Sequence, residues 1–438
     1  MAQLKITSRM RSSNPDYEER FIQWYDEEGN LVEIRGIANE CDYGCAQWIR
    51  KSPDNGRTWS EWEKQYNDAD DGRRGKIPGN EFGDEILGGK PTPTLYDPKS
   101  GCYVGASSMI YILKGHDVGY FAMCEEGEDN YRVHSYFAYK KPNGETVTRM
   151  FEFEEEGCDY DPENPRNPKF LDYNRVSCEN LTILPDGDLM LTLFPNMRIC
   201  CKLAGVDVKA YFPSWPEYQC GMLVARGHWN PEKEDYEFTY SNPIMLSDLQ
   251  SSRGVMEPHL ITLKNGVWMV VLRGSNWAFD KWNTRISPAA PNFKWYALSY
   301  DEGRTFSPVM PWHFDTREVV YSPASISRFF RSSKNGKLYW IGNVSEEPWT
   351  LFGNDPRFPL QICEVNEEYG YLIKDTLTVV DTIREGETSV ELSNFFLIED
   401  KETLNLELSM VKVNFNGKIQ EEGHWYSEAW EYTITFDD

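Results

Sequence analysis

A recurring β-hairpin pattern is the feature of this sequence that most constrains its fold. An apolar run, a turn containing Gly, Asn, Asp or Lys, and a second apolar run recur six times, and apolar residues almost nowhere follow helical spacing. Successive turns lie roughly 65 to 85 residues apart, which is the length of one elaborated four-stranded blade. The six hairpins are Arg20–Arg35, Pro93–Ser107, Asn180–Phe194, Pro258–Arg273, Ser325–Gly342 and Asn394–Ser409.

The hairpins predict an all-β fold, a six-bladed β-propeller of four-stranded antiparallel blades, in a single domain spanning residues 1–438. A third strand follows most hairpins, as at Cys45–Lys51. The N-terminal strand Leu4–Arg9 is expected to pair with the last strand, Trp430–Phe436, and so to close the ring. The stretch from about residue 124 to 175 is rich in acids and prolines, which central strands exclude, and is predicted to be a long rim insertion.

The charge balance excludes several classes of partner. With 45 Lys and Arg against 70 Asp and Glu, the net charge is −25, which is the wrong sign for binding a nucleic-acid backbone or an anionic membrane. The sequence has no apolar run long enough for a membrane-spanning helix, and Met1–Asn14 lacks the apolar core of a secretory signal. A cytoplasmic protein is therefore expected, or a secreted one if a signal peptide has been removed. The oligomeric state stays open.

The sequence carries no motif for a cofactor. It has no glycine-rich phosphate loop, no dinucleotide fingerprint and no His-Glu-x-x-His helix, so no cofactor is expected. The ten cysteines include the adjacent Cys200 and Cys201 and lack the paired spacing of zinc ligands, so we expect reduced thiols and no metal. Acidic loops leave a structural Ca²⁺ open, although no motif specifies one.

Two turns share the motif Ser-x-Asp-x-Gly-x-Thr followed by an aromatic residue, at Ser52–Trp59 and Ser299–Phe306. In such a turn the Asp accepts backbone N–H groups, the Gly adopts positive φ, and the aromatic ring packs into the blade. The motif resembles the Asp box of the sialidase superfamily, and the six-bladed propeller of that family agrees with the hairpin count. The resemblance implies the fold and not the chemistry, because hydrolases, lyases and binding propellers share this peripheral turn.

Function is expected at the face where the first strand of each hairpin begins and the second ends, because loops from all blades converge there on a central funnel. Arginines are concentrated at these positions, and a planar guanidinium group can bind a carboxylate through two hydrogen bonds. The sequence therefore predicts an anionic carbohydrate substrate. The predicted substrate-binding residues are Arg20, Arg35, Arg175, Glu179, Arg253, Arg273 and Trp277. Trp282, Trp312 and Trp349 also lie in predicted loops and are candidates for stacking on sugar rings.

The hairpin that runs from Glu257 to Arg273 resembles the sialidase hairpin whose first and last residues share the active site. In that family the Glu polarises a Tyr nucleophile, three Arg hold the substrate carboxylate, and an Asp after the first hairpin is the acid/base. The resemblance implies these roles, position by position, for Glu257, Arg273, Arg20, Arg35 and, as the acid/base, Asp42.

Further catalytic candidates leave three functions open. The last hairpin begins at Glu387–Glu391 without a Tyr, so Tyr321, which opens the fifth hairpin, is the candidate nucleophile. The main hypothesis is an exo-acting glycoside hydrolase that removes a terminal acidic sugar from a glycan. One alternative is a polysaccharide lyase for uronic-acid glycans, with His259 or Tyr321 as the base. The other is a non-catalytic carbohydrate-binding propeller.

Structural roles are also open for several of these residues. Glu257 and Arg273 could form a salt bridge at the top of a blade, and Arg175 and Glu179 an ion pair between blades. His259 is either a packing residue or a general acid or base.

Overall fold

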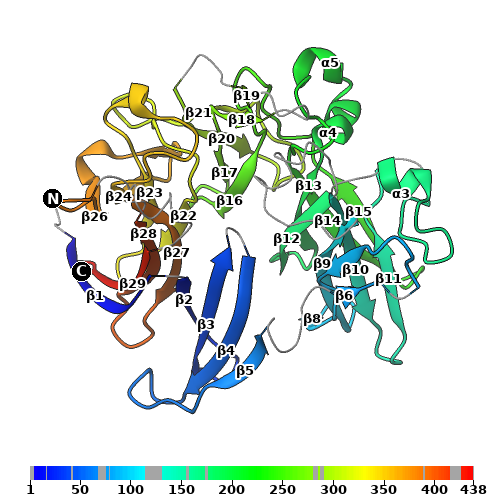
Figure 1. The fold of residues 1–438 in the computed structure, drawn as a ribbon, viewed down its shortest axis with the longest axis horizontal. Helices are drawn as coiled ribbons and strands as arrows, with labels where there is room; N and C mark the ends of the chain where they lie inside the picture. Colours follow the sequence, from blue (N-terminus) through cyan, green and yellow to red (C-terminus); the bar gives the residue numbers. More distant parts are fainter. Residues whose placement is uncertain are drawn as a thin grey trace.

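The computed structural model describes residues 4–437 except 16, 41–42, 68–74, 78, 114–130, 154–156, 173–175, 280–284, 287–290, 388–389 and 415–425. Apart from one two-stranded ribbon, its described strands form six antiparallel sheets arranged as blades around one centre, so the predicted six-bladed propeller is confirmed (Figure 1). Blade one contains β2 (Glu18–Tyr25), β3 (Leu31–Glu40), β4 (Tyr43–Ser52) and β5 (Glu63–Asn67). Blade two contains β6 (Gly75–Lys76), β7 (Glu85–Leu87), β8 (Leu95–Asp97), β9 (Cys102–Ile112), β10 (Tyr131–Lys140) and β11 (Thr146–Met150).

The remaining blades follow in chain order around the ring. Blade three contains β12 (Val176–Ile183), β13 (Leu189–Pro195), β14 (Leu223–Asn230) and β15 (Asp235–Tyr240). Blade four contains β16 (Met256–Thr262), β17 (Trp268–Arg273), β20 (Lys294–Ser299) and β21 (Met310–Pro311), and the connection from β17 to β20 carries the ribbon β18 (Ala278–Phe279) and β19 (Arg285–Ile286). Blade five contains β22 (Arg328–Arg331), β23 (Leu338–Asn343), β24 (Leu360–Asn366), β25 (Tyr371–Leu372) and β26 (Thr378–Asp381). Blade six contains β27 (Val390–Glu399), β28 (Leu406–Asn414), β29 (Tyr426–Thr435) and the N-terminal β1 (Lys5–Asn14). Short helices lie between strands at α3 (Pro168–Asp172), α4 (Met197–Ala204), α5 (Val208–Tyr211), η2 (Pro348–Thr350) and η3 (Lys374–Thr376).

In blades three, four and five the second strand is buried along its whole length. Every residue of β13, β17 and β23 is buried. A strand covered on both faces reads as a continuous apolar run, which explains why these segments mark the hairpins so clearly in the sequence. The first strands β12 and β16 contain exposed residues, and Figure 1 shows them beside the centre of the ring.

Strand β1 closes the ring as predicted. It pairs antiparallel with β29 from Lys5↔Thr435 to Asn14↔Ser427, with a register shift between Met10 and Ser12. The N-terminal segment thereby becomes the outer strand of the last blade and covers the edge that β29 would otherwise expose.

The structure corrects the prediction of a rim insertion over residues 124–175. Strand β10 lies between β9 and β11 in the sheet of blade two, and its segment 134–139 is buried. The acids and prolines that suggested a loop are concentrated after β11, in residues 152–168, whereas Tyr131–Lys140 is rich in aromatic and β-branched residues. The average composition of the whole stretch concealed two strands of the blade.

Neither a membrane helix nor a metal-binding group of side chains is found among the described residues. No helix there is long and apolar enough to cross a membrane. The same residues contain no group of three or more His, Cys, Asp or Glu side chains that could hold a metal ion. Among the described residues, Cys102, Cys178, Cys200, Cys201 and Cys363 are free thiols.

Both predicted Asp boxes form, in the β4–β5 and β20–β21 turns. In the second box, Asp301 accepts hydrogen bonds from the amide and the hydroxyl of Thr305 at 2.8 and 2.6 Å, while the Ser299 hydroxyl accepts the amide of Gly303 at 2.8 Å. Gly303 has a φ of 81°. The bonds from Thr305 lower the pKa of Asp301 to about 2. Its carboxylate therefore supports the turn at ordinary pH and loses this role only as the pH falls through about 2.

Substitution of Ser299 by Ala is expected to destabilise the protein measurably. The Ser299 side chain is buried, so its loss leaves the buried amide of Gly303 without an acceptor and lowers the free energy of unfolding by about 1 kcal/mol. Chemical denaturation measures this difference. Ser333→Ala, at an exposed turn position, is the matched control and should change stability by less than about 0.5 kcal/mol. Equal effects of the two substitutions would show that the box contributes nothing.

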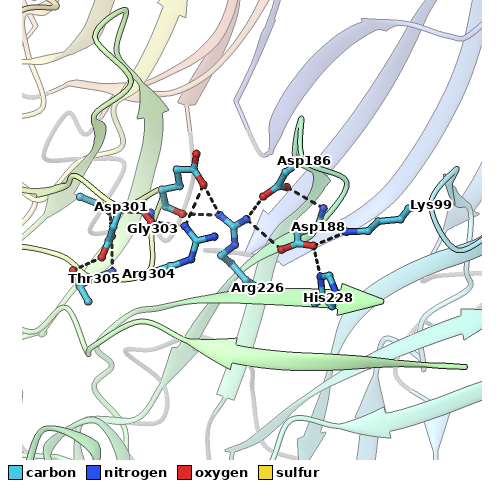
Figure 2. A network of polar contacts seen from close by, with 11 residues as sticks. Lys99, Asp186, Asp188, Arg226, His228, Asp301, Gly303, Arg304 and Thr305 are labelled. Carbon is cyan, nitrogen blue, oxygen red and sulfur yellow. Dashed lines mark hydrogen bonds and ion pairs between the residues drawn. The ribbon is translucent and has the colours of Figure 1, made fainter. Parts of the chain in front are cut away.

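A network of ion pairs joins the second Asp box to blade three (Figure 2). Arg226, on β14, has a side chain only 5% exposed and contacts the carboxylates of Asp186 and Asp188, which lie in the turn between β12 and β13. Its Nη1 also donates a 2.9 Å hydrogen bond to the backbone oxygen of Glu302, inside the box. One buried guanidinium group therefore connects the hairpin turn of blade three to the outer turn of blade four.

The same network extends to blade two through Asp188. Lys99, in the turn between β8 and β9, donates to the Asp188 carboxylate at 3.0 Å, and His228 Nδ1 lies 2.8 Å from it (Figure 2). Burial would raise the pKa of Asp188, but His228, Lys99 and Arg226 more than offset this, so its pKa lies below the usual value. Residues of blades two and three thus share one ionised carboxylate at the periphery of the ring, and Arg226 links it to the backbone of Glu302 in blade four.

Candidate functional site

Three glutamates lie at interruptions of the inner strands. The pairing of β12 with β13 shifts just after Glu179, that of β16 with β17 shifts at Glu257, and that of β27 with β28 shifts just after Glu391. Glu257 itself has a φ of 40°, in the left-handed region that non-glycine residues seldom adopt. A β-bulge redirects side chains out of the regular alternation of a strand and is frequent beside active sites. These bulges redirect the inner strands of blades three, four and six at their glutamates.

The best-defined contact of the site is the pair Glu257 and Arg273. Arg273, the last residue of β17, donates from Nη1 to Glu257 Oε2 at 2.6 Å and from Nη2 to Asn354 Oδ1 at 3.1 Å. The Arg273 side chain is 7% exposed and that of Glu257 is 37% exposed. The guanidinium group is therefore fixed below the surface, while the carboxylate remains accessible to a ligand.

Positive charge surrounds the Glu257 carboxylate. Burial would raise its pKa, but Arg273, Arg357 and Lys294 more than offset this, so the pKa lies below its usual value. Arg253 adds a further positive charge near Arg273. Glu257 is thus held in the ionised form within a cationic centre.

The segment Leu351–Arg357, which follows η2, supplies two polar groups to this centre. Asn276 holds the segment: its Nδ2 donates to the carbonyl of Leu351 at 2.9 Å, and its Oδ1 accepts the amide of Gly353 at 2.8 Å. Gly353 has a φ of 59°, and a Cβ there would lie 3.3 Å from the Trp277 side chain, so glycine fits where other residues would be strained and crowded. Trp277 therefore packs against the segment that presents Asn354 to Arg273.

Arg357 links this segment to blade six. Its Nη1 donates to Glu391 Oε2 at 2.7 Å, and its Nε and Nη2 donate to the carbonyl oxygen of Ala324 at 3.2 and 3.0 Å. Burial raises the pKa of Glu391, the negative charges of Asp355 and Glu18 raise it further, and Arg357 offsets only part of this. Glu391 therefore holds a proton to higher pH than an exposed glutamate.

Glu179, on blade three, interacts electrostatically with Glu257 on the neighbouring blade four. Burial and the negative charge of Glu257 raise the pKa of Glu179, while Arg328 opposes them. Within the described part of the chain, its carboxylate forms no ion pair. Two glutamates of adjacent blades thus have pKa values displaced in opposite directions.

The two arginines of the first hairpin point to opposite faces of it. Arg20 is opposite Gly36 and Arg35 is opposite Phe21 in the β2–β3 pairing, so their side chains alternate. Arg20 donates to Glu18 at 2.5 Å. Arg35 pairs with Glu19, and its guanidinium carbon lies 5.3 Å from the centre of the Trp48 ring. The structure therefore does not bring Arg20 and Arg35 to one carboxylate-binding position.

The other predicted catalytic residues of blades four and five have structural partners. His259 Nδ1 accepts the amide of Phe329 at 2.6 Å, and burial, aided by Arg328, lowers its pKa to about 4. The Tyr321 ring packs on Phe293 with centroids 5.3 Å apart, and its hydroxyl has no hydrogen bond to Glu257. Both residues thus have packing roles in this structure.

Several predicted residues fall elsewhere. Asp42, Arg175 and Trp282 lie outside the described residues. The prediction that Trp312 stacks on sugar is wrong: its side chain is fully buried in the core, and its Nε1 donates to the carbonyl of Gly370 at 2.7 Å. Trp349, by contrast, is 81% exposed.

Sequence reasoning did not find several residues of the centre. They are Lys294, Asn354 and Arg357, which lie at the start of a third strand or in a proline-rich loop, and Glu391, which stands at the entry of the last hairpin but was given no role. The sequence did contain one indication of Arg357, which stands between two prolines in Asp-Pro-Arg-Phe-Pro. Prolines make a loop rigid, and a charged residue held in such a loop is a candidate for a specific contact.

Comparisons with known proteins find likenesses of structure. No protein-family model matches the sequence, and no curated protein matches it. A protein of unknown function from Dyadobacter fermentans matches with 12% identity over 98% of this chain and 99% of that chain, with a TM-score of 0.48. NanB sialidase from Streptococcus pneumoniae matches with 10% identity over 97% of this chain and 70% of that chain, with a TM-score of 0.48. Trypanosoma rangeli sialidase matches with 10% identity over 98% of this chain and 59% of that chain, with a TM-score of 0.44. At such identities these matches carry no information about activity.

Proposed function

We propose that this protein is a glycoside hydrolase that removes a terminal acidic sugar from a glycan. The observation that carries the proposal is the pair Glu179 and Glu257, which lie at bulges in the inner strands of adjacent blades, close enough for the charge of Glu257 to raise the pKa of Glu179 while the pKa of Glu257 itself is lowered. Most glycoside hydrolases use one carboxylic acid that is protonated and one carboxylate that is ionised. The cationic groups beside Glu257 favour an anionic sugar.

In the proposed mechanism each side chain has one task. Arg273, fixed by Asn354, binds the carboxylate of the sugar together with Arg357. Glu179 donates its proton to the leaving oxygen as the glycosidic bond breaks. Glu257, ionised, attacks the anomeric carbon as this bond breaks and forms a glycosyl ester, which water hydrolyses after giving its proton to Glu179; alternatively, Glu257 takes the proton of a water that attacks the anomeric carbon directly. This differs from the scheme that the family resemblance implies, because Glu257 has no tyrosine partner among the described residues.

The lyase alternative has less support. A lyase needs a free base near the sugar ring, and His259 uses Nδ1 to accept the Phe329 amide. Its pKa of about 4 also makes it a poor proton acceptor at neutral pH. Asp42 remains a proposed acid/base, in competition with Glu179.

Assays of the wild-type protein test the proposal. Fluorogenic aryl glycosides of sialic acid and glucuronic acid should release the aryl group and the intact sugar acid. The absorbance of an unsaturated uronate among the products of a uronic-acid glycan would instead establish a lyase. Binding of the sugar acids without any product would establish a non-catalytic propeller.

A further inference from the structure

Lys294, the first residue of β20, is a buried cation directly beside Arg273. The two residues are opposite each other in the β17–β20 pairing, and the Lys294 side chain is fully buried. Its Nζ donates a hydrogen bond to the carbonyl oxygen of Ser325. Within the described ranges no carboxylate lies at ion-pair distance from this Nζ, so the ammonium charge has no direct counter-ion there. Buried lysines are rarely charged without such a partner.

The charged groups that act on Lys294 come from three neighbouring elements, whereas the segments of Trp312, Val320 and Ser325 contact it through backbone groups. These charged groups are Arg273 on β17, Glu257 on β16 and Arg357 on the segment after η2. Burial lowers the pKa of Lys294 to about 7, Arg273 and Arg357 lower it as well, and Glu257 opposes them. Any group that adds negative charge near Arg273 would therefore return a proton to Lys294.

We propose that Lys294 is a proton-responsive positioning residue: it takes up a proton when a carboxylate ligand binds at Arg273 and Arg357, and releases it when the ligand leaves. The inference rests on the proposed function, which supplies the anionic ligand. Coupling between two binding events is reciprocal, so a ligand that favours protonated Lys294 binds more tightly when that proton is already present. Affinity for an acidic sugar should consequently fall as the pH rises through neutrality.

The sign of the effect on stability provides a ligand-free check. Lys294 has a pKa of about 7 in the folded protein and an ordinary value of 10.5, so between these values the unfolded chain binds more protons. Stability should therefore rise with pH across this window because of this group. Lys294→Met should remove that rise.

The first experiment is an NMR titration of the Lys294 side chain in the free wild-type protein. The signal, assigned by its loss in Lys294→Met, should titrate near pH 7 and move to lower pH in Glu257→Gln, because the opposing negative charge is gone. A midpoint near that of exposed lysines, or no response to Glu257→Gln, would overturn the proposal.

The second experiment measures proton uptake on binding of free sialic acid and free galacturonic acid. Calorimetry in two buffers of different ionisation enthalpy should give an uptake of about half a proton at pH 7, with affinity falling about fivefold between pH 6 and pH 8. Lys294→Met should flatten this pH dependence, whereas Lys264→Met, at an exposed turn, should leave it unchanged. Binding by the wild type without proton uptake would overturn the role of Lys294 alone. Absence of binding at every pH, in a protein whose Lys294 titrates near pH 7, would overturn the acidic ligand and with it the linkage.

Discussion

Glu257→Gln is expected to lower turnover by at least ~100-fold per folded molecule, which is the usual scale for removal of a positioned acid or base. The amide keeps the shape of the side chain and can still accept from Arg273, but it can act neither as a nucleophile nor as a base. The measurement is the rate of aryl glycoside hydrolysis, with the fraction folded determined by circular dichroism. Binding of the free sugar acid should persist, because Arg273 and Arg357 remain.

The matched control is Glu237→Gln on the outer strand β15, where the side chain is 47% exposed and pairs with Lys233. It should keep wild-type turnover. If Glu257→Gln lost stability and yet kept full turnover per folded molecule, the Glu257–Arg273 pair would be a structural salt bridge and the proposed mechanism would fail.

Comparison of Glu179→Gln with Asp42→Asn identifies the acid. The variant that removes the true acid should lose activity strongly on substrates with poor leaving groups and much less on activated aryl glycosides, which need little protonation. The pH profile offers an independent check. Its ascending limb should lie below 4.5, the ordinary glutamate pKa, because Glu257 must be ionised, and its descending limb above 4.5, because Glu179 must keep its proton.

The parts of the structure that could be predicted are those specified by local sequence. The side-chain hydrogen bonds that shape the turn of an Asp box run between residues a few positions apart, such as Asp301 and Thr305, so the motif alone predicts the geometry of the turn. The hairpins of blades three to five were equally accessible, because their second strands are buried and largely apolar. The prediction of blade two lacked strand β10. This strand lies far along the chain from β9, and its composition was averaged with that of an acidic neighbouring segment.

The site could be predicted only where it coincides with the ends of a hairpin. Glu257 and Arg273 were found for this reason. Arg357 was not, because its contacts with Ala324 and Glu391 are more than 30 residues away in sequence and depend on how three elements meet. Lys294 begins an ordinary apolar strand, and only its pairing with Arg273 gives it a place in the site. Bulges such as the one at Glu257 decide where a side chain points, and no residue type marks them reliably.

Arg226→Met is expected to lower the free energy of unfolding by about 2 kcal/mol, because it removes a buried guanidinium group that pairs with Asp186 and Asp188 and donates to the carbonyl of Glu302. Asp188 keeps Lys99 and His228, which limits the loss, whereas the carbonyl of Glu302 loses its donor. Urea denaturation of both proteins measures the difference. It should shrink in acid, since the pKa of Asp188 is lowered and its contribution is lost as the pH falls through that value.

Arg304→Met is the matched control, because Arg304 lies in the Asp box that contains Glu302 and its side chain is 54% exposed (Figure 2). Its pairing with Glu302 is solvated, so its loss should cost less than about 0.5 kcal/mol. Arg226→Lys should recover only part of the stability, since a single ammonium group cannot reach two carboxylates and a carbonyl as the guanidinium fork does. Full recovery by Lys, or equal losses in Arg226→Met and Arg304→Met, would mean that charge alone matters here and that the fork does not hold the turns of blades three and four together.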